Sequence, residues 1–130
     1  MALGLASGEA AKILDALGNA TNYTAPTAFW IQLHTADPGA AGTTAIAGNA
    51  TRKQVSFGAA SGGAIANDTA VSWTTGEVDT TEDYTHWSAW TLVSAGTFIC
   101  SGTVTANAVV VGDTFTIPIG DLDLTLSVAA

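Results

Sequence analysis

Three residues of this sequence, His34, His86 and Cys100, are of the types that carry nucleophilic or acid–base catalysis. Such catalysis needs a serine or cysteine within hydrogen-bond reach of a histidine that is itself oriented. Both histidines lie in runs of strand-like composition, and Cys100 could approach His86 across a hairpin, a proximity that many hairpins produce by chance. The sequence also lacks a Gly-x-Ser-x-Gly elbow, a His-Glu-x-x-His helix and a glycine-rich phosphate loop. We therefore expect no catalytic residue.

Cys100 is the only cysteine, so the chain cannot form an internal disulfide. It follows Thr97, Phe98 and Ile99 in an apolar run, where a free cysteine behaves as a small hydrophobic residue. We predict that Cys100 packs in the core.

The only charge cluster of the chain lies between residues 76 and 83. It contains four carboxylates, the ligand type that hard cations such as calcium prefer: Glu77, Asp79, Glu82 and Asp83. Their spacing matches no calcium-loop template, and acidic loops are usually solvated. We therefore interpret the segment as an acidic surface loop and expect no metal and no cofactor.

Four tryptophans in a small domain raise the question of a carbohydrate-binding platform: Trp30, Trp73, Trp87 and Trp90. Trp87 and Trp90 are three residues apart, so they point to opposite faces of a regular strand. At least one of them should then be exposed, or covered by another element or subunit. This arrangement favours a core or interface role, and a carbohydrate-binding module remains an alternative.

The composition restricts the possible partners of the chain. The 130 residues fit one domain, 1–130, and only 11% of them are charged, against roughly 25% in an average soluble domain. The net charge of −8 repels nucleic acids and anionic lipids. No apolar run approaches a membrane span, and Met1 to Leu5 do not resemble a secretory signal. A surface of small neutral side chains packs against a partner at low cost, which indicates a homo-oligomer.

One helix is predicted near the N-terminus, at about residues 7–18, with Ser7 as its cap and Gly18 at its end. Ile13, Leu14 and Leu17 form a narrow apolar stripe at helical spacing. The stripe packs either on the same domain or on a neighbouring subunit. The candidate interface residues are thus Ile13, Leu14, Leu17, Trp30, Trp87 and Trp90.

The rest of the chain alternates between short strand-like runs and small-residue segments. The predicted strands are residues 28–34, 51–57, 69–74, 84–92, 97–101, 103–111, 114–119 and 122–128. Residues 84–92 and 97–101 flank the turn 94–96 and form the clearest hairpin. This pattern predicts an all-β fold, an antiparallel, jelly-roll-like β-sandwich of about eight strands with one N-terminal α-helix.

We predict a core that includes Trp73, Phe98, Phe115, Leu124 and Leu126. The last strand alternates cleanly, so Leu122, Leu124, Leu126 and Val128 should share one face.

Several motifs in order resemble a known family. They are HTADPG at 34–39, RKQVSFGAA at 52–60, THWSAW at 85–90 and SAGTF at 94–98. This series resembles a family of small structural proteins of tailed bacteriophages, especially frequent in phages of actinobacteria and commonly described as tail-fibre or minor tail proteins. The acidic insertion 76–83 departs from the family pattern.

The resemblance implies a non-enzymatic virion component with a β-sandwich fold, assembled in the host cytoplasm and partnered by other virion proteins of the tail or capsid. Small acidic β-domains also serve as head decoration proteins that stabilise the capsid shell. The leading interpretation is a tail-associated protein, with head decoration and a carbohydrate-binding module as the alternatives.

Overall fold

The computed structural model describes residues 3–129, which form one helix and nine strands. The elements are β1 (Gly4–Leu5), α1 (Ser7–Gly18), β2 (Phe29–His34), β3 (Lys53–Val55), β4 (Ala64–Ala66), β5 (Val71–Trp73), β6 (Glu82–Trp90), β7 (Phe98–Val109), β8 (Phe115–Ile117) and β9 (Asp123–Thr125). Every strand pair is antiparallel. The predicted all-β sandwich with an N-terminal helix is confirmed.

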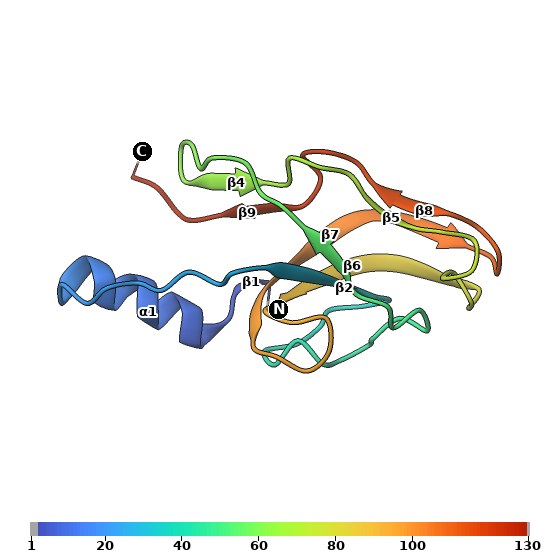
Figure 1. Cartoon of the computed structure of the whole chain (residues 1–130), viewed down its shortest axis with the longest axis horizontal. Coiled ribbons are helices and arrows are strands. Elements are labelled where there is room, and N and C mark those ends of the chain that lie inside the picture. The colour runs from blue at the N-terminus through green and yellow to red at the C-terminus, as the bar shows by residue number, and fades with distance from the viewer. Residues whose placement is uncertain (1–2, 130) are drawn as a thin grey trace.

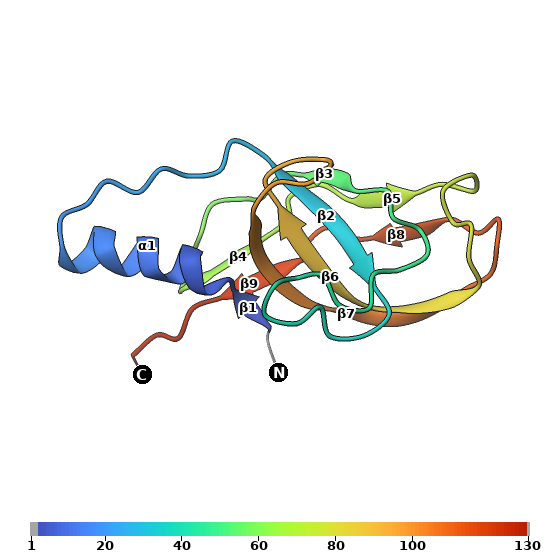
Figure 2. The same cartoon turned by 90° about the horizontal axis from the view of Figure 1, so that it is seen from below.

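The strands form two layers (Figures 1 and 2). One layer is a five-stranded sheet in the order β1-β7-β6-β2-β3. The other consists of two separate two-stranded ribbons, β4-β9 and β5-β8, where a regular jelly roll has a second continuous sheet. Aromatic rings join the layers, because Phe115 of β8 contacts Tyr84 of β6 with ring centroids 5.0 Å apart.

The predicted hairpin is present as the β6–β7 pair. The runs expected at 97–101 and 103–111 are one continuous strand, β7, because Gly102 lies inside the ladder opposite Trp87. A Cβ atom at position 102 would lie only 2.8 Å from the Trp87 indole. The glycine thus admits the ring of Trp87 and does not mark a turn.

Two strands were not predicted. β1 lies before the helix, and β4 lies in the small-residue stretch that the sequence suggested was a loop. The helix itself has the predicted range, but its N-cap is Ala6, without a side-chain hydrogen bond, and Ser7 is its first helical residue. The expected Ser7 cap is therefore wrong. The chain enters the helix from the β1 ladder, where the Ala6 amide donates to the Ile99 carbonyl (2.7 Å).

The core lies between the two layers and is centred on Trp73, Trp87 and Tyr84, all fully buried. Burial of Trp73 and Phe115 was predicted correctly. Phe98 and Leu124 are only half-buried.

The predicted burial of Leu126 is wrong, since this residue is 46% exposed. Leu122 is fully buried, and Leu124 packs on the edge of the core, but the β4–β9 ladder ends at Thr125. Beyond Thr125 the chain extends toward the α1 end of the molecule (Figure 1). The alternation of apolar and polar residues continues there, but no core covers the apolar side chains.

A pair of leucines in this C-terminal segment tests the burial pattern. Leu122→Ala should lower the free energy of unfolding by about 2–5 kcal/mol, because it leaves a cavity in the core. Leu126→Ala should cost less than about 1 kcal/mol, since that side chain is already largely hydrated. Urea denaturation of both variants measures the difference, and equal losses would contradict the structure.

Candidate interaction surfaces

The imidazole of His34 lies at the centre of a buried hydrogen-bond network. Its Nδ1 lies 2.8 Å from the Thr44 carbonyl oxygen, and its Nε2 lies 2.7 Å from Ser88 Oγ. A carbonyl only accepts, so Nδ1 carries the proton and the Ser88 hydroxyl donates to Nε2. Ser88 Oγ in turn accepts from Trp90 Nε1 (2.8 Å). Burial lowers the pKa of His34, which keeps the ring neutral.

This serine–histidine pair has the separation of a nucleophile and its base, but both residues are fully buried. A substrate cannot reach a hydroxyl that no solvent reaches, so we interpret the pair as a structural hydrogen bond that joins β2 to β6. The sequence alone does not reveal the contact, because the two residues are 54 positions apart. No local pattern signals such a pair.

The other two reactive residues lie apart from each other along the β6–β7 ladder. Cys100 is opposite Ala89, and His86 is opposite Thr103. Cys100 is buried, as predicted, and burial raises the pKa of its thiol to about 12. His86 Nδ1 lies 2.7 Å from the Thr85 hydroxyl. The conceivable Cys100–His86 pair is not formed.

The acidic carboxylates bind parts of this chain. Glu77 accepts hydrogen bonds from the Thr74 amide (2.8 Å) and forms an ion pair with Lys53, whose hydrogen bond lowers the pKa of Glu77. Glu82 belongs to β6 and accepts from the Gly48 amide (2.8 Å). Within residues 3–129, no group of three or more His, Cys, Asp or Glu side chains is arranged to hold a metal ion.

Trp87 and Trp90 lie on opposite faces of β6, as predicted, and the outer ring is covered by another segment of the chain. Trp87 is fully buried and Trp90 is 8% exposed, and the ladder is irregular between Ala89 and Trp90. Trp87 belongs to the core cluster, whereas Trp90 Nε1 donates to Ser88 Oγ, two residues earlier on the same face of β6, and Arg52 covers the Trp90 ring from the segment before β3. Both rings are enclosed by the chain's own residues, which corrects the interface prediction for Trp87 and Trp90. Trp30 is half-buried opposite Trp90.

Arg52 covers Trp90 and ties down the β6–β7 turn. Its guanidinium lies 4.3 Å from the centroid of the Trp90 ring. Its Nη1 donates to the carbonyl oxygens of Leu92 (2.9 Å) and Ala95 (2.7 Å). One cation therefore holds a tryptophan, a turn and the start of β3 together.

Exposed hydrophobic side chains lie at one end of the molecule. We call this region the apolar end and define it as α1, the β4–β9 ribbon and residues 126–129. A cavity of about 170 Å³ lies there, lined only by apolar and small residues: Leu5, Ile13, Ala60, Gly63, Ala64, Ile65, Leu124 and Leu126. Leu14 is 64% and Leu17 84% exposed, and Val128 is also exposed. The helical stripe is thus only partly covered, by way of Ile13.

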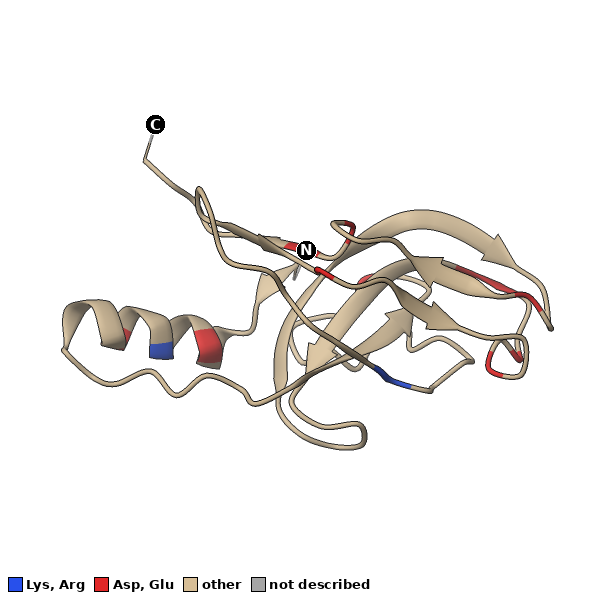
Figure 3. Cartoon of the chain, turned by 45° about the horizontal axis from the view of Figure 1, so that its top comes forward, with Lys and Arg blue, Asp and Glu red and all other residues tan. Residues whose placement is uncertain are grey.

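Charge is distributed unevenly over the molecule (Figure 3). Several acidic segments gather at the end of the sandwich that lies away from α1. This end includes the loop before β6. The helix carries both signs, and its Lys12 is paired with Glu9 at 2.6 Å. The apolar end is consequently the less acidic end.

An acidic β-sandwich with His34 and Cys100 buried and an apolar end left open has the construction of a structural assembly protein. Residues 5–125 match the model of the protein family described as "Podophage GP4 fiber I protein gp80". The chain therefore belongs to this family, which makes it a phage structural protein of the tail-fibre type and a component of the virion. A comparison with curated proteins found no match. No helix within the described residues has the length and hydrophobicity needed to span a bilayer.

Loss of the Arg52 contacts should weaken the fold. Arg52→Ala removes the hydrogen bonds to two carbonyls and the stacking on Trp90, so we expect a loss of about 1–3 kcal/mol in the free energy of unfolding. Asp83→Ala, which removes an exposed carboxylate from β6, is the control and should change stability by about 0.5 kcal/mol or less. Urea denaturation compares them, and equal effects would refute the assigned role of Arg52.

Stability should depend on pH through His34. Its pKa is lowered in the folded protein, so below about pH 6.5 the unfolded chain binds a proton that the folded protein excludes. The contribution of neutral His34 to the free energy of unfolding is therefore fully present above that pH and is lost as the pH falls below it. Between about pH 7.5 and pH 5.5, the wild type should lose more stability than His34→Gln. Parallel stability curves for the two proteins would contradict this.

Proposed function

We propose that this chain is a non-enzymatic, tail-associated subunit of the minor tail or fibre type, and that it binds its neighbours in the virion through the apolar end. The observation that carries the proposal is the exposure of Leu14 and Leu17 beside the apolar cavity. Family membership supports the tail-fibre assignment. Burial of Trp87 and Trp90 argues against a carbohydrate platform built on these rings.

The proposal also covers the state of the protein and its source. The chain folds as a single cooperative domain and forms a homo-oligomer. It is assembled in the host cytoplasm and belongs to a phage of an actinobacterium. A second copy is a suitable neighbour because the main group of acidic segments lies at the opposite end of the sandwich from α1 (Figure 3). Two copies that meet through the apolar end therefore bring fewer carboxylates together. Exposed leucines at a contact lose their hydration when covered, and this burial supplies the attraction.

Sedimentation over a concentration series tests self-association. The wild type should form oligomers, and Leu14→Ser/Leu17→Ser should sediment as a monomer, because the variant replaces the apolar contact with hydroxyls. Both leucines are exposed, so the monomeric variant should unfold within about 1 kcal/mol of the wild type.

Leu92→Ser/Val93→Ser is the matched control, since these two exposed residues lie in the β6–β7 turn. It should assemble like the wild type. A wild-type chain that stays monomeric and does not bind virions lacking it would refute the proposal. Gold-labelled antibody on particles locates the protein, and label on the head would replace the tail assignment with head decoration.

A further inference from the structure

The sandwich is closed along one side and open along the other. On the closed side, β3 of the large sheet lies against β5 of the second layer. On the open side, β7 contacts β9 and faces β8 across a cavity. Among residues 3–129, β7 pairs with β6 along one edge, with an irregular step between Thr103 and Asn107, and its other edge pairs only with β1, at Cys100 and Ser101. β8 pairs with β5 alone.

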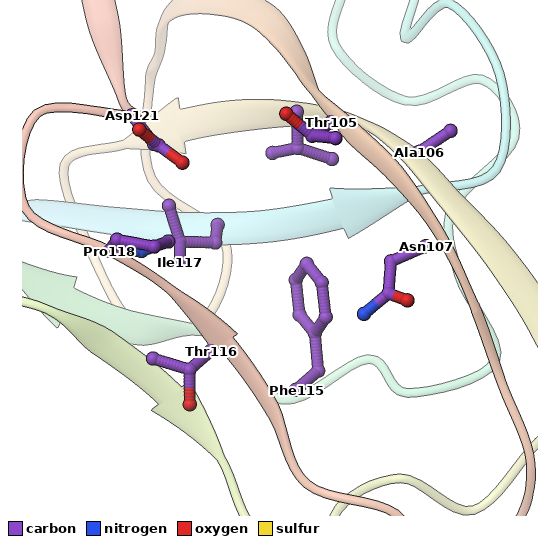
Figure 4. A pocket seen from close by; sticks show the side chains of 9 residues that line it. Thr105, Ala106, Asn107, Phe115, Thr116, Ile117, Pro118 and Asp121 are labelled. Carbon is purple, nitrogen blue, oxygen red and sulfur yellow. The ribbon is translucent and has the colours of Figure 1, made fainter.

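A cleft runs between these two strands. A volume of about 310 Å³ is bounded by residues 104–107 of β7 and 115–118 of the β8 segment. It continues into a second volume of about 390 Å³ toward Thr103, Asp121 and Asp123. Figure 4 shows Phe115 and Ile117 on one wall, Thr105 and Asn107 on the other, and Asp121 beside Pro118.

The walls of the cleft offer unpaired backbone. No backbone hydrogen bond joins β7 to β8 in the part of the chain that the structure describes. Thr103 and the residues from Thr105 to Ala108 are exposed, so this edge of β7 faces solvent over much of its length. An open strand edge is a template on which another extended chain can pair.

We propose that the cleft between β7 and β8 binds an extended segment of a different protein, which adds to the β7 edge as a strand and carries a lysine or arginine. Asp121 and Asp123 supply the charge complementarity, because they line the cleft and have no side-chain partner among residues 3–129.

A second copy of this chain does not meet that requirement. All of its cations are engaged internally: Lys12 with Glu9, Lys53 with Glu77, and Arg52 with Trp90 and two carbonyls. A saccharide is also a poorer fit. Phe115 is the only aromatic residue in the cleft wall, and at 4% exposure it offers no ring face for stacking.

The cleft meets the apolar end only at Asp123 and includes neither Leu14 nor Leu17, so its test is independent of the proposed function. The probe is a synthetic peptide, Lys-Thr-Val-Thr-Val-Thr-Lys, titrated to millimolar concentration into the intact chain. Amide hydrogen exchange is followed by NMR. Alternate amides in residues 103–107, and amides of β8 if the added strand bridges both walls, should exchange at least about tenfold more slowly at saturation.

Two controls separate strand addition from other binding. A peptide N-methylated at alternate residues cannot donate along one edge and should give no protection. Asp121→Asn/Asp123→Asn should weaken binding by about threefold, whereas Asp15→Asn/Asp79→Asn removes the same charge elsewhere and should not. The proposal is overturned if the peptide protects no β7 amide, if the N-methylated peptide protects equally, or if only an oligosaccharide such as maltoheptaose gives protection.

Discussion

The contact between the Trp87 indole and the backbone of Gly102 is the constraint on which the other contacts depend. Only a residue without a side chain allows the ring to lie against β7, since a Cβ there would approach to 2.8 Å. The contact places β6 and β7 in register. β6 then carries β2 on its other edge, and β7 pairs with β1. The position of α1 and the open edge of β7 both follow from this one pair of strands.

The sequence was most informative where side chains decide the local structure. Aromatic and β-branched runs predicted the ends of β2 to within one residue and those of β6 to within two, because such side chains favour a half-buried pleated surface. β4 consists of Ala64, Ile65 and Ala66, and β1 contains a glycine at positive φ. Their own residues favour strands weakly. Pairing with β9 and β7 makes them strands, and local sequence does not contain that information.

Burial was harder to predict than strand position. Leu122 and Leu126 share a face of the same alternating segment, yet one is fully buried and the other 46% exposed. Alternation determines the face on which a side chain lies, but not how far the opposing layer extends. The tryptophans show the reverse effect. The period of two correctly places Trp87 and Trp90 on opposite faces, but the Arg52 guanidinium that covers Trp90 comes from a segment distant in the sequence and is not visible in that period.

The three basic side chains of this acidic protein restrict the partners with which it can associate. Each of the three basic residues is held by groups of the same chain, so the surface offers carboxylates without compensating positive charge. Contacts between like copies then have to be apolar and lie away from the acidic end, as the leucines of α1 do. A contact beside Asp121 and Asp123 selects a chain that brings its own cation. The same charge pattern thus assigns different kinds of partner to the two surfaces.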